Sequence, residues 1–259
     1  MVLIQLLLIG ILAFGENLEK QNSHTCGVRN KSFQNGEELE YSLNYGIIHG
    51  GSGSIRLIDT VYENIPVYHA SILAKSVGIT DLIYKIEDIY ESYFDTITCL
   101  PYKSVRNISE GGYKFYDEVY FARKDSSVFS QKGGTFKVPP NILDIVSSLF
   151  YLRRLNLDTL KTGEVIKIIT FFGDEIFPFN LRYKGKEVIK TRLGKFECHR
   201  FDPVVEVGRV FSSEDDMSFW ITADHNLIPL RVRLKIIVGS VTCDLVSFKN
   251  LVSEMKPIL

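Results

Sequence analysis

Strict alternation of apolar and polar residues along most of the chain predicts a protein built from β-strands. In the segment 38–45, leucine or tyrosine occupies every odd position and a polar residue every even position. A period of two places the apolar side chains on one face, which is typical of a half-buried antiparallel strand. The alternation resumes at Ile55 and Leu57, and we expect the glycine-rich stretch 50–53 to form the turn between these two strands.

Similar patterns recur as far as the C-terminus. The further strands that we expect cover 67–74, 86–94, 100–108, 113–121, 127–129, 165–172, 177–184, 186–192, 196–202, 217–222, 228–238 and 240–249. A short helix is expected at 79–84. We do not extend this helix further, because Glu87, Glu91 and Asp95 would then lie one turn apart as like charges.

One longer helix is predicted over 141–154. Pro139 and Pro140 end the preceding strand, and Asn141 and Asp144 have the spacing of a capping box. Apolar residues then recur at helical spacing, and the two arginines at the end of the segment suit the helix dipole.

The order of these elements predicts the fold class. No repeat, low-complexity tract or linker divides the chain. We therefore expect a single mainly β domain over 33–251, with a polar lead-in at 16–32 and a tail at 252–259. The domain is predicted to be a curved, partly closed, barrel-like antiparallel sheet with one central α-helix.

The first 15 residues are expected to be a signal peptide. Positions 2–14 are apolar apart from Gln5 and Gly10, and the run ends at Ala13-Phe14-Gly15, a small-x-small cleavage site. This run is too short to span a bilayer, and no later run is long enough, so no transmembrane span is expected. We expect export to the periplasm or cell envelope of a Gram-negative bacterium. No Lys or Arg precedes the run, which leaves the true start codon open.

Composition excludes two classes of protein. The chain has 30 Lys and Arg against 31 Asp and Glu, so it lacks the basic excess of a nucleic-acid binder. Its hydrophobic fraction of 45% excludes wholesale disorder. The 17 phenylalanines and 13 tyrosines further favour β-structure.

Four cysteines suit an oxidising compartment. Cys26, Cys99, Cys198 and Cys243 allow three disulfide connectivities. We expect the pairs Cys26–Cys99 and Cys198–Cys243, because each pair lies within one half of the chain. No CxxC motif is present, so neither a redox motif nor a zinc site is supported, and we expect no metal or cofactor.

No recognised catalytic motif is present. The stretch from His49 to Gly53 resembles an oxyanion-hole loop, but the chain has no G-x-S-x-G elbow and a glycine turn explains the stretch. We therefore name no catalytic residue. An enzyme would require Ser52, His69, His199 or Asp144 to converge in one cleft.

A series of short motifs points to a family. They are Phe33 with Gly36, Glu37, Leu39 and Tyr41; Tyr90 to Asp95; Leu100-Pro101-Tyr102; Glu110-Gly111; the helix Asp144 to Arg153; Gly185-Lys186-Glu187; Gly194-Lys195-Phe196; Pro203; Trp220-Ile221-Thr222; and Ile228-Pro229. In this order they resemble the bacterial exported domain-of-unknown-function family numbered three-one-zero-eight, in particular its Bacteroidetes-type members. The resemblance covers about 33–251. It implies an exported, mostly antiparallel β protein and supplies no catalytic residues.

The function that we expect is a non-enzymatic binding or carrier module for an apolar or lipid-like ligand, with the helix 141–154 flanking the cavity. The candidate contact residues are Asp144, Tyr151 and Arg153 on the helix, together with Trp220. The alternative is a structural or assembly module that docks on an outer-membrane or surface complex. It would do so through an exposed edge strand or apolar patch.

Overall fold

One antiparallel sheet makes up most of the molecule. The computed structural model describes residues 32–204, 216–235 and 239–258. In these ranges the sheet has 14 strands in the order β8-β7-β6-β5-β4-β3-β2-β1-β14-β13-β12-β11-β10-β9. Their bounds are β1 Glu37–Tyr45, β2 Ile48–Tyr62, β3 Ile65–Ser76, β4 Ile86–Asp95, β5 Pro101–Glu110, β6 Tyr113–Ala122, β7 Ser127–Ser130, β8 Gly134–Lys137, β9 Val165–Phe172, β10 Glu175–Thr191, β11 Gly194–Pro203, β12 Met217–Thr222, β13 Pro229–Lys235 and β14 Ser240–Lys249.

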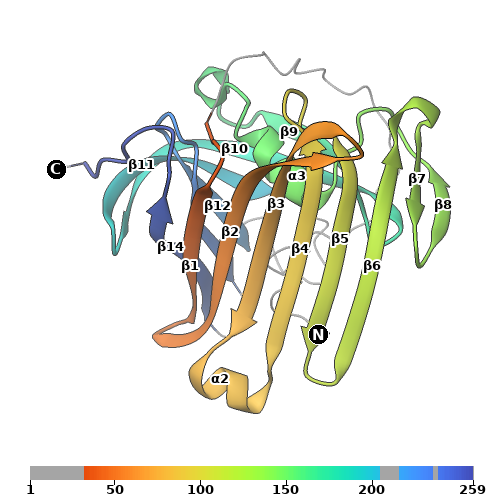
Figure 1. Cartoon of the computed structure of the whole chain (residues 1–259). Coiled ribbons are helices and arrows are strands. Elements are labelled where there is room, and N and C mark those ends of the chain that lie inside the picture. The colour runs from red at the N-terminus through yellow and green to blue at the C-terminus, as the bar shows by residue number, and fades with distance from the viewer. Residues whose placement is uncertain (1–31, 205–215, 236–238, 259) are drawn as a thin grey trace.

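The sheet curves into a barrel that stays open. Strands β1–β8 form a first arm and β9–β14 a second arm, and the two join where β1 pairs with β14. The arms curve towards each other around the helix α3 (Ile145–Leu152), as Figure 1 shows. The edge strands β8 and β9 do not pair with each other. The predicted fold class, a partly closed antiparallel sheet with a central helix, is confirmed.

Alternation decides which face of each strand is buried. In β4, every second residue from Ile86 to Phe94 is buried, and the residues between them are not. The buried face packs on α3, which contacts β3, β4 and β9. Phe150 of α3 is fully buried between the rings of Phe33 and Phe94, with ring centroids 5.0 and 5.2 Å away. The helix thus fills part of the space that the curved sheet encloses.

The helix α3 begins later than predicted. Asp144 is its N-cap and accepts hydrogen bonds from the backbone N–H groups of Val146 and Ser147, both at 2.8 Å. Asn141 lies outside the helix with φ of 64°. The reason is tertiary, because Leu143 donates its N–H to the backbone of β9, and this pairing holds Leu143 outside the helix.

The glycine-rich stretch 50–53 is not a turn, and that prediction was wrong. It lies inside β2, and the chain reverses at Gly46 instead. Glycine is needed in the strand because a Cβ on Gly51 would lie 2.9 Å from the backbone oxygen of Lys75 on β3. A missing side chain here therefore permits close strand packing.

The other predicted helix and strand boundaries differ less from those in the structure. The short helix α2 (Gly78–Ile83) follows the prediction, whereas the two strands expected at 177–184 and 186–192 form one strand, β10, with a bulge near Gly185. The signal peptide at 1–15 and Cys26 lie outside the described residues. Within the described ranges, no helix is both long and apolar enough to cross a membrane.

Candidate ligand-binding cavity

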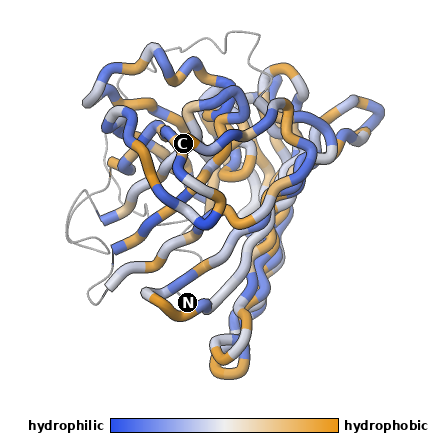
Figure 2. The backbone as a smooth tube through the Cα atoms, turned by 90° about the vertical axis from the view of Figure 1, so that its left-hand side faces the viewer, coloured by the Kyte–Doolittle hydropathy of each residue, from blue (hydrophilic) through white to orange (hydrophobic). Residues whose placement is uncertain are grey.

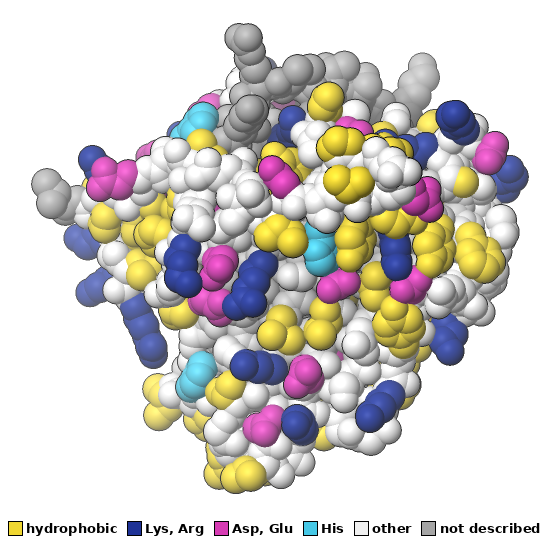
Figure 3. All heavy atoms as spheres, viewed as in Figure 1, with side chains coloured by type: hydrophobic (Ala, Val, Ile, Leu, Met, Phe, Trp, Pro, Cys, Tyr) yellow, Lys and Arg dark blue, Asp and Glu magenta, His cyan; other side chains and the backbone are white. Residues whose placement is uncertain are grey.

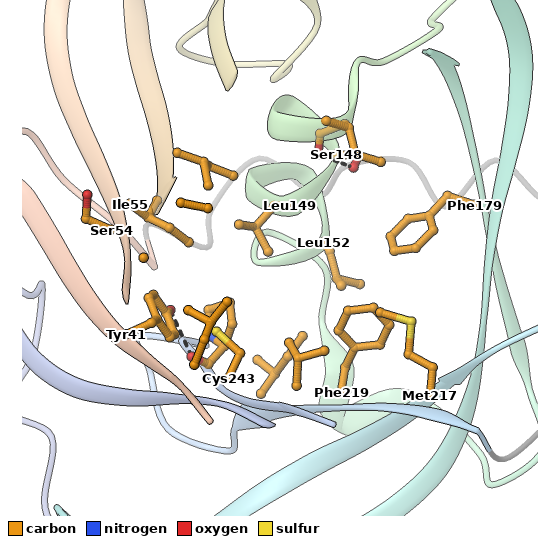
Figure 4. Close-up of a pocket in the computed structure, with 18 of the residues that line it drawn as sticks. Tyr41, Ser54, Ile55, Ser148, Leu149, Leu152, Phe179, Met217, Phe219 and Cys243 are labelled. Atoms are coloured by element: carbon orange, nitrogen blue, oxygen red, sulfur yellow. Dashed lines mark hydrogen bonds between the residues drawn. The ribbon is translucent and has the colours of Figure 1, made fainter. Parts of the chain in front are cut away.

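An apolar cavity of about 170 Å³ lies between α3 and the two arms of the sheet. Its walls come from β1–β3 on one side, from α3, and from β10 and β12–β14 on the other side (Figure 4). The lining residues are Tyr41, Leu43, Gly53, Ser54, Ile55, Ile72, Leu73, Ala74, Ile145, Ser148, Leu149, Leu152, Phe179, Leu181, Met217, Phe219, Ile221, Pro229, Val232 and Cys243.

None of these described lining residues carries a charge. Their main polar side chains are already used by the protein itself. The hydroxyl of Tyr41 donates to the backbone oxygen of Pro229 at 2.9 Å, and the hydroxyl of Ser148 donates to the backbone oxygen of Ile145 at 2.8 Å. The walls thus offer a ligand contact area but few free hydrogen-bonding groups.

Several large apolar side chains face the cavity without being fully buried. Leu149, Phe219 and Val232 project from three different elements, and each is only partly buried. When an apolar ligand covers such partly exposed side chains, apolar surface is removed from water and the free energy falls. Gly53 also lines the cavity and adds room there, because it has no side chain.

Cys243 brings a thiol to the cavity wall. Burial raises its pKa to about 12, so the thiol is protonated at neutral pH. The predicted disulfide between Cys198 and Cys243 is wrong, since both are free thiols. Strands β12 and β13 separate β11 from β14. Three strand spacings place the two cysteines roughly 14 Å apart across the sheet, which is too far for a disulfide.

The candidate contact residues do not line this cavity. Arg153 is fully buried in an ion pair with Glu37, at the end of α3. Trp220 is buried on the other face of β12, where its indole N–H donates to Glu187 and the guanidinium groups of Arg200 and Arg233 lie near its ring. The third of them, Tyr151, is half-buried and packs between two clusters of core residues.

Asp144, the fourth candidate, lines a separate pocket of about 30 Å³. Burial raises its pKa to about 6, although Ser92 donates a hydrogen bond to it at 2.5 Å. Tyr90 and Arg106 line the same pocket, and Ile145 lines both this pocket and the apolar cavity. A pocket of this size and polarity has room for one or two water molecules.

The residues that an enzyme would need lie apart. His69 stacks on Tyr93, whereas His199 shares a hydrogen bond with Tyr183 at 3.0 Å. Neither histidine is within hydrogen-bonding distance of Asp144 or of Ser52 among the described contacts. The described residues also contain no group of three His, Cys, Asp or Glu side chains that could hold a metal ion.

Fold and cavity together define a class, an open β-barrel-like protein with an internal apolar cavity. The chain belongs to the family described as "Protein of unknown function (DUF3108)", whose model matches residues 40–246. The sequence signals that pointed to this family are therefore confirmed at the family level. The lining of the cavity was not foreseen, because its residues come from segments far apart in the chain.

One solved structure supports the fold. The chain is similar to a "beta-barrel-like protein of domain of unknown function DUF1849" from Brucella abortus, with a TM-score of 0.56 and 9% identity over 83% of this chain and 97% of that chain. A hypothetical protein from Chlamydia trachomatis is less similar, with a TM-score of 0.37 and 9% identity over 87% of this chain and 92% of that chain. No curated protein matches the sequence.

Proposed function

We propose that the protein binds an apolar or lipid-like ligand in the cavity between α3 and the two arms, and carries or holds it without catalysis. The observation that supports this proposal is the uncharged apolar lining of the cavity between α3 and the two arms. Apolar pockets with few polar groups are the usual form of small-molecule binding sites.

The size of the cavity favours a slender ligand. An apolar cavity of about 150 Å³ is large enough to bind benzene, and the one described here is slightly larger. It suits a single acyl chain or a ring-sized group better than a lipid with two chains. Each buried methylene contributes about 0.8 kcal/mol, so eight of them would contribute about 6 kcal/mol before the cost of association.

We further propose that this protein is exported to the periplasm or cell envelope of a Gram-negative bacterium of the Bacteroidetes type. The predicted signal peptide at 1–15 and the motif series support the proposal. N-terminal sequencing of the protein from its own cells tests it, with a first residue at Glu16 as the expected result. An unprocessed protein in the cytoplasm would contradict it.

The experiment that tests ligand binding is native mass spectrometry of the protein isolated from its own cells, followed by organic extraction. We expect a discrete added mass that extracts as a lipid. The variant Leu149→Trp fills the cavity and should lose this mass, whereas Leu251→Ser, a half-buried position that does not line the cavity, should retain it. A bare mass for the wild-type protein would contradict the proposal and favour an assembly role.

The assembly alternative makes a different structural demand. It requires an exposed edge strand or patch. Of the two edge strands, β8 is only four residues long and ends in Lys137, whereas β9 has eight residues and is bridged by Leu143 at Thr170. Short edges with a lysine are poor templates for strand addition. Cross-linking in whole cells would reveal a stable protein partner if this role applies.

A further inference from the structure

One end of the molecule carries large apolar side chains on its outer surface. These side chains, here called the apolar rim, belong to the β1–β2 turn, to the first residue of β2 and to α2. They are Ile47, Ile48, Ile79, Leu82 and Ile83, which are 102%, 50%, 64%, 86% and 79% exposed. Figure 1 shows the turn and α2 projecting at the same end, and Figure 2 shows hydrophobic segments at that tip. In the space-filling view of Figure 3, apolar side chains emerge at its lower edge.

The helix α2 is amphipathic, but its apolar side faces outward. Ile79, Leu82 and Ile83 have the spacing of one helical face, and α2 buries none of its residues. Its polar side turns to the protein, since the carboxylate of Asp81 accepts a hydrogen bond from Ser76 of β3 at 2.7 Å. A helix that packed on the core would turn its apolar side to the protein and its polar side to solvent.

A layer of tyrosines and lysines lies behind the apolar rim. Tyr45, Tyr84 and Tyr113 are about two-fifths exposed, and they belong to β1, to the segment after α2 and to β6. The exposed lysines beside them are Lys75, Lys85 and Lys114, with Glu87 as the exposed carboxylate of the same region. Tyrosine and lysine behind aliphatic tips is the order of groups found at a membrane–water interface.

The apolar rim adjoins the cavity. Leu43 and Ala74 line the cavity, and each lies on a strand that leads directly to the rim. Leu43 and Tyr45 are two residues apart on β1, which corresponds to roughly 7 Å along a strand. The end of the cavity that Leu43 and Ala74 line is therefore the end nearest to the rim.

We propose that the apolar rim docks on the surface of a lipid bilayer. Ile47, Leu82 and Ile83 enter the acyl region, the tyrosines lie at the level of the head groups, and the lysines contact lipid phosphates. A bilayer fits better than a protein because exposed tyrosines and lysines lie behind the aliphatic tips, which is the order of groups that a membrane–water interface favours. The docking itself depends only on the rim, whereas delivery of a ligand to the membrane rests on the proposed function.

Flotation with vesicles tests the docking. The protein, expressed in its own host, is mixed with vesicles of phosphatidylethanolamine and phosphatidylglycerol, and the bound fraction is measured. The double variant Leu82→Ser/Ile83→Ser should lose about tenfold or more in affinity for each side chain removed. The matched control is Val61→Ser/Ile97→Ser, which removes two side chains of 65% and 63% exposure at the opposite end, and it should float like the wild type.

Three results would overturn the inference. They are a wild-type protein that does not float, a rim variant that floats as well as the wild type, and a dimer in vesicle-free solution that the rim variant abolishes. Native mass spectrometry of the same variants separates the two proposals. If the rim variant fails to float but retains the extracted lipid, both docking through the rim and ligand binding in the cavity are supported. If wild type carries no lipid but floats, only the proposed function fails.

Discussion

The guanidinium of Arg153 and the carboxylate of Glu37 form a bidentate ion pair that is closed to solvent, with Nη1–Oε1 and Nη2–Oε2 distances of 2.6 and 2.8 Å. Arg153 also donates to the backbone oxygens of Ser32 and Asn226, at 2.9 and 3.0 Å. The pair therefore ties the end of α3 to the start of β1 and to the β12–β13 turn. This arrangement gives Arg153 a structural role next to the core.

We expect Arg153→Met to lower the free energy of unfolding by about 3–5 kcal/mol, because it leaves the Glu37 carboxylate buried without a counterion. Urea denaturation measures the change. The double variant Glu37→Leu/Arg153→Met should recover part of the loss, since it removes both charges. A single variant as stable as the wild type would show that the pair is not closed to water.

We expect Asp144 to make the protein more stable as the pH falls from 7 towards 4. Its folded pKa of about 6 lies above its ordinary value of 3.8, so the folded state binds more protons between these values and gains stability when the carboxyl is protonated. Protonation of Asp144 thus raises the free energy of unfolding by about 3 kcal/mol at most. Asp88, whose pKa burial also raises to about 6, acts in the same direction.

The variant Asp144→Asn isolates this effect, because asparagine is also a good N-cap but does not titrate. Its unfolding free energy should depend less steeply on pH than that of the wild type between pH 4 and 7. Equal slopes for the two proteins would contradict the assignment of a raised pKa to Asp144.

We expect Gly51→Ala to destabilise the protein by about 1–3 kcal/mol, because the new Cβ meets the backbone oxygen of Lys75 at 2.9 Å and the strands must separate. The matched variant is Gly53→Ala, whose Cβ would lie 3.4 Å from the backbone oxygen of Leu73. Thermal unfolding of both should show a lower midpoint for Gly51→Ala. If the two midpoints fell equally, the close strand contact would not be the cause.

We expect the thiol of Cys243 to react slowly with maleimide at pH 8, because its pKa of about 12 leaves little thiolate. Since Cys243 lines the cavity, a ligand bound there should slow the reaction further. Cys198 is the control, with a fully buried thiol away from the cavity whose pKa is also raised to about 12. Mass spectrometry of the labelled peptides distinguishes the two sites, and labelling of Cys243 that no apolar compound slows would count against a ligand in the cavity.

The alternating pattern predicted the strands and their buried faces, because this signal depends only on neighbouring residues. The same holds for α2, which we did not extend because a longer helix would place Glu87, Glu91 and Asp95 one turn apart as like charges. Local signals were ambiguous where two residues competed for one role. Asn141 and Asp144 are both good caps, and the pairing of Leu143 with β9 decided between them.

The sequence by itself determined the mainly β class, the order of the elements and the membership of the family. Only the tertiary structure decided the cavity, the free thiols of Cys198 and Cys243, and the burial of Arg153 against Glu37. The physical reason is the range of the interactions. A strand pattern is set within a few residues, whereas a cavity or a buried ion pair depends on how two arms of a curved sheet meet around a helix.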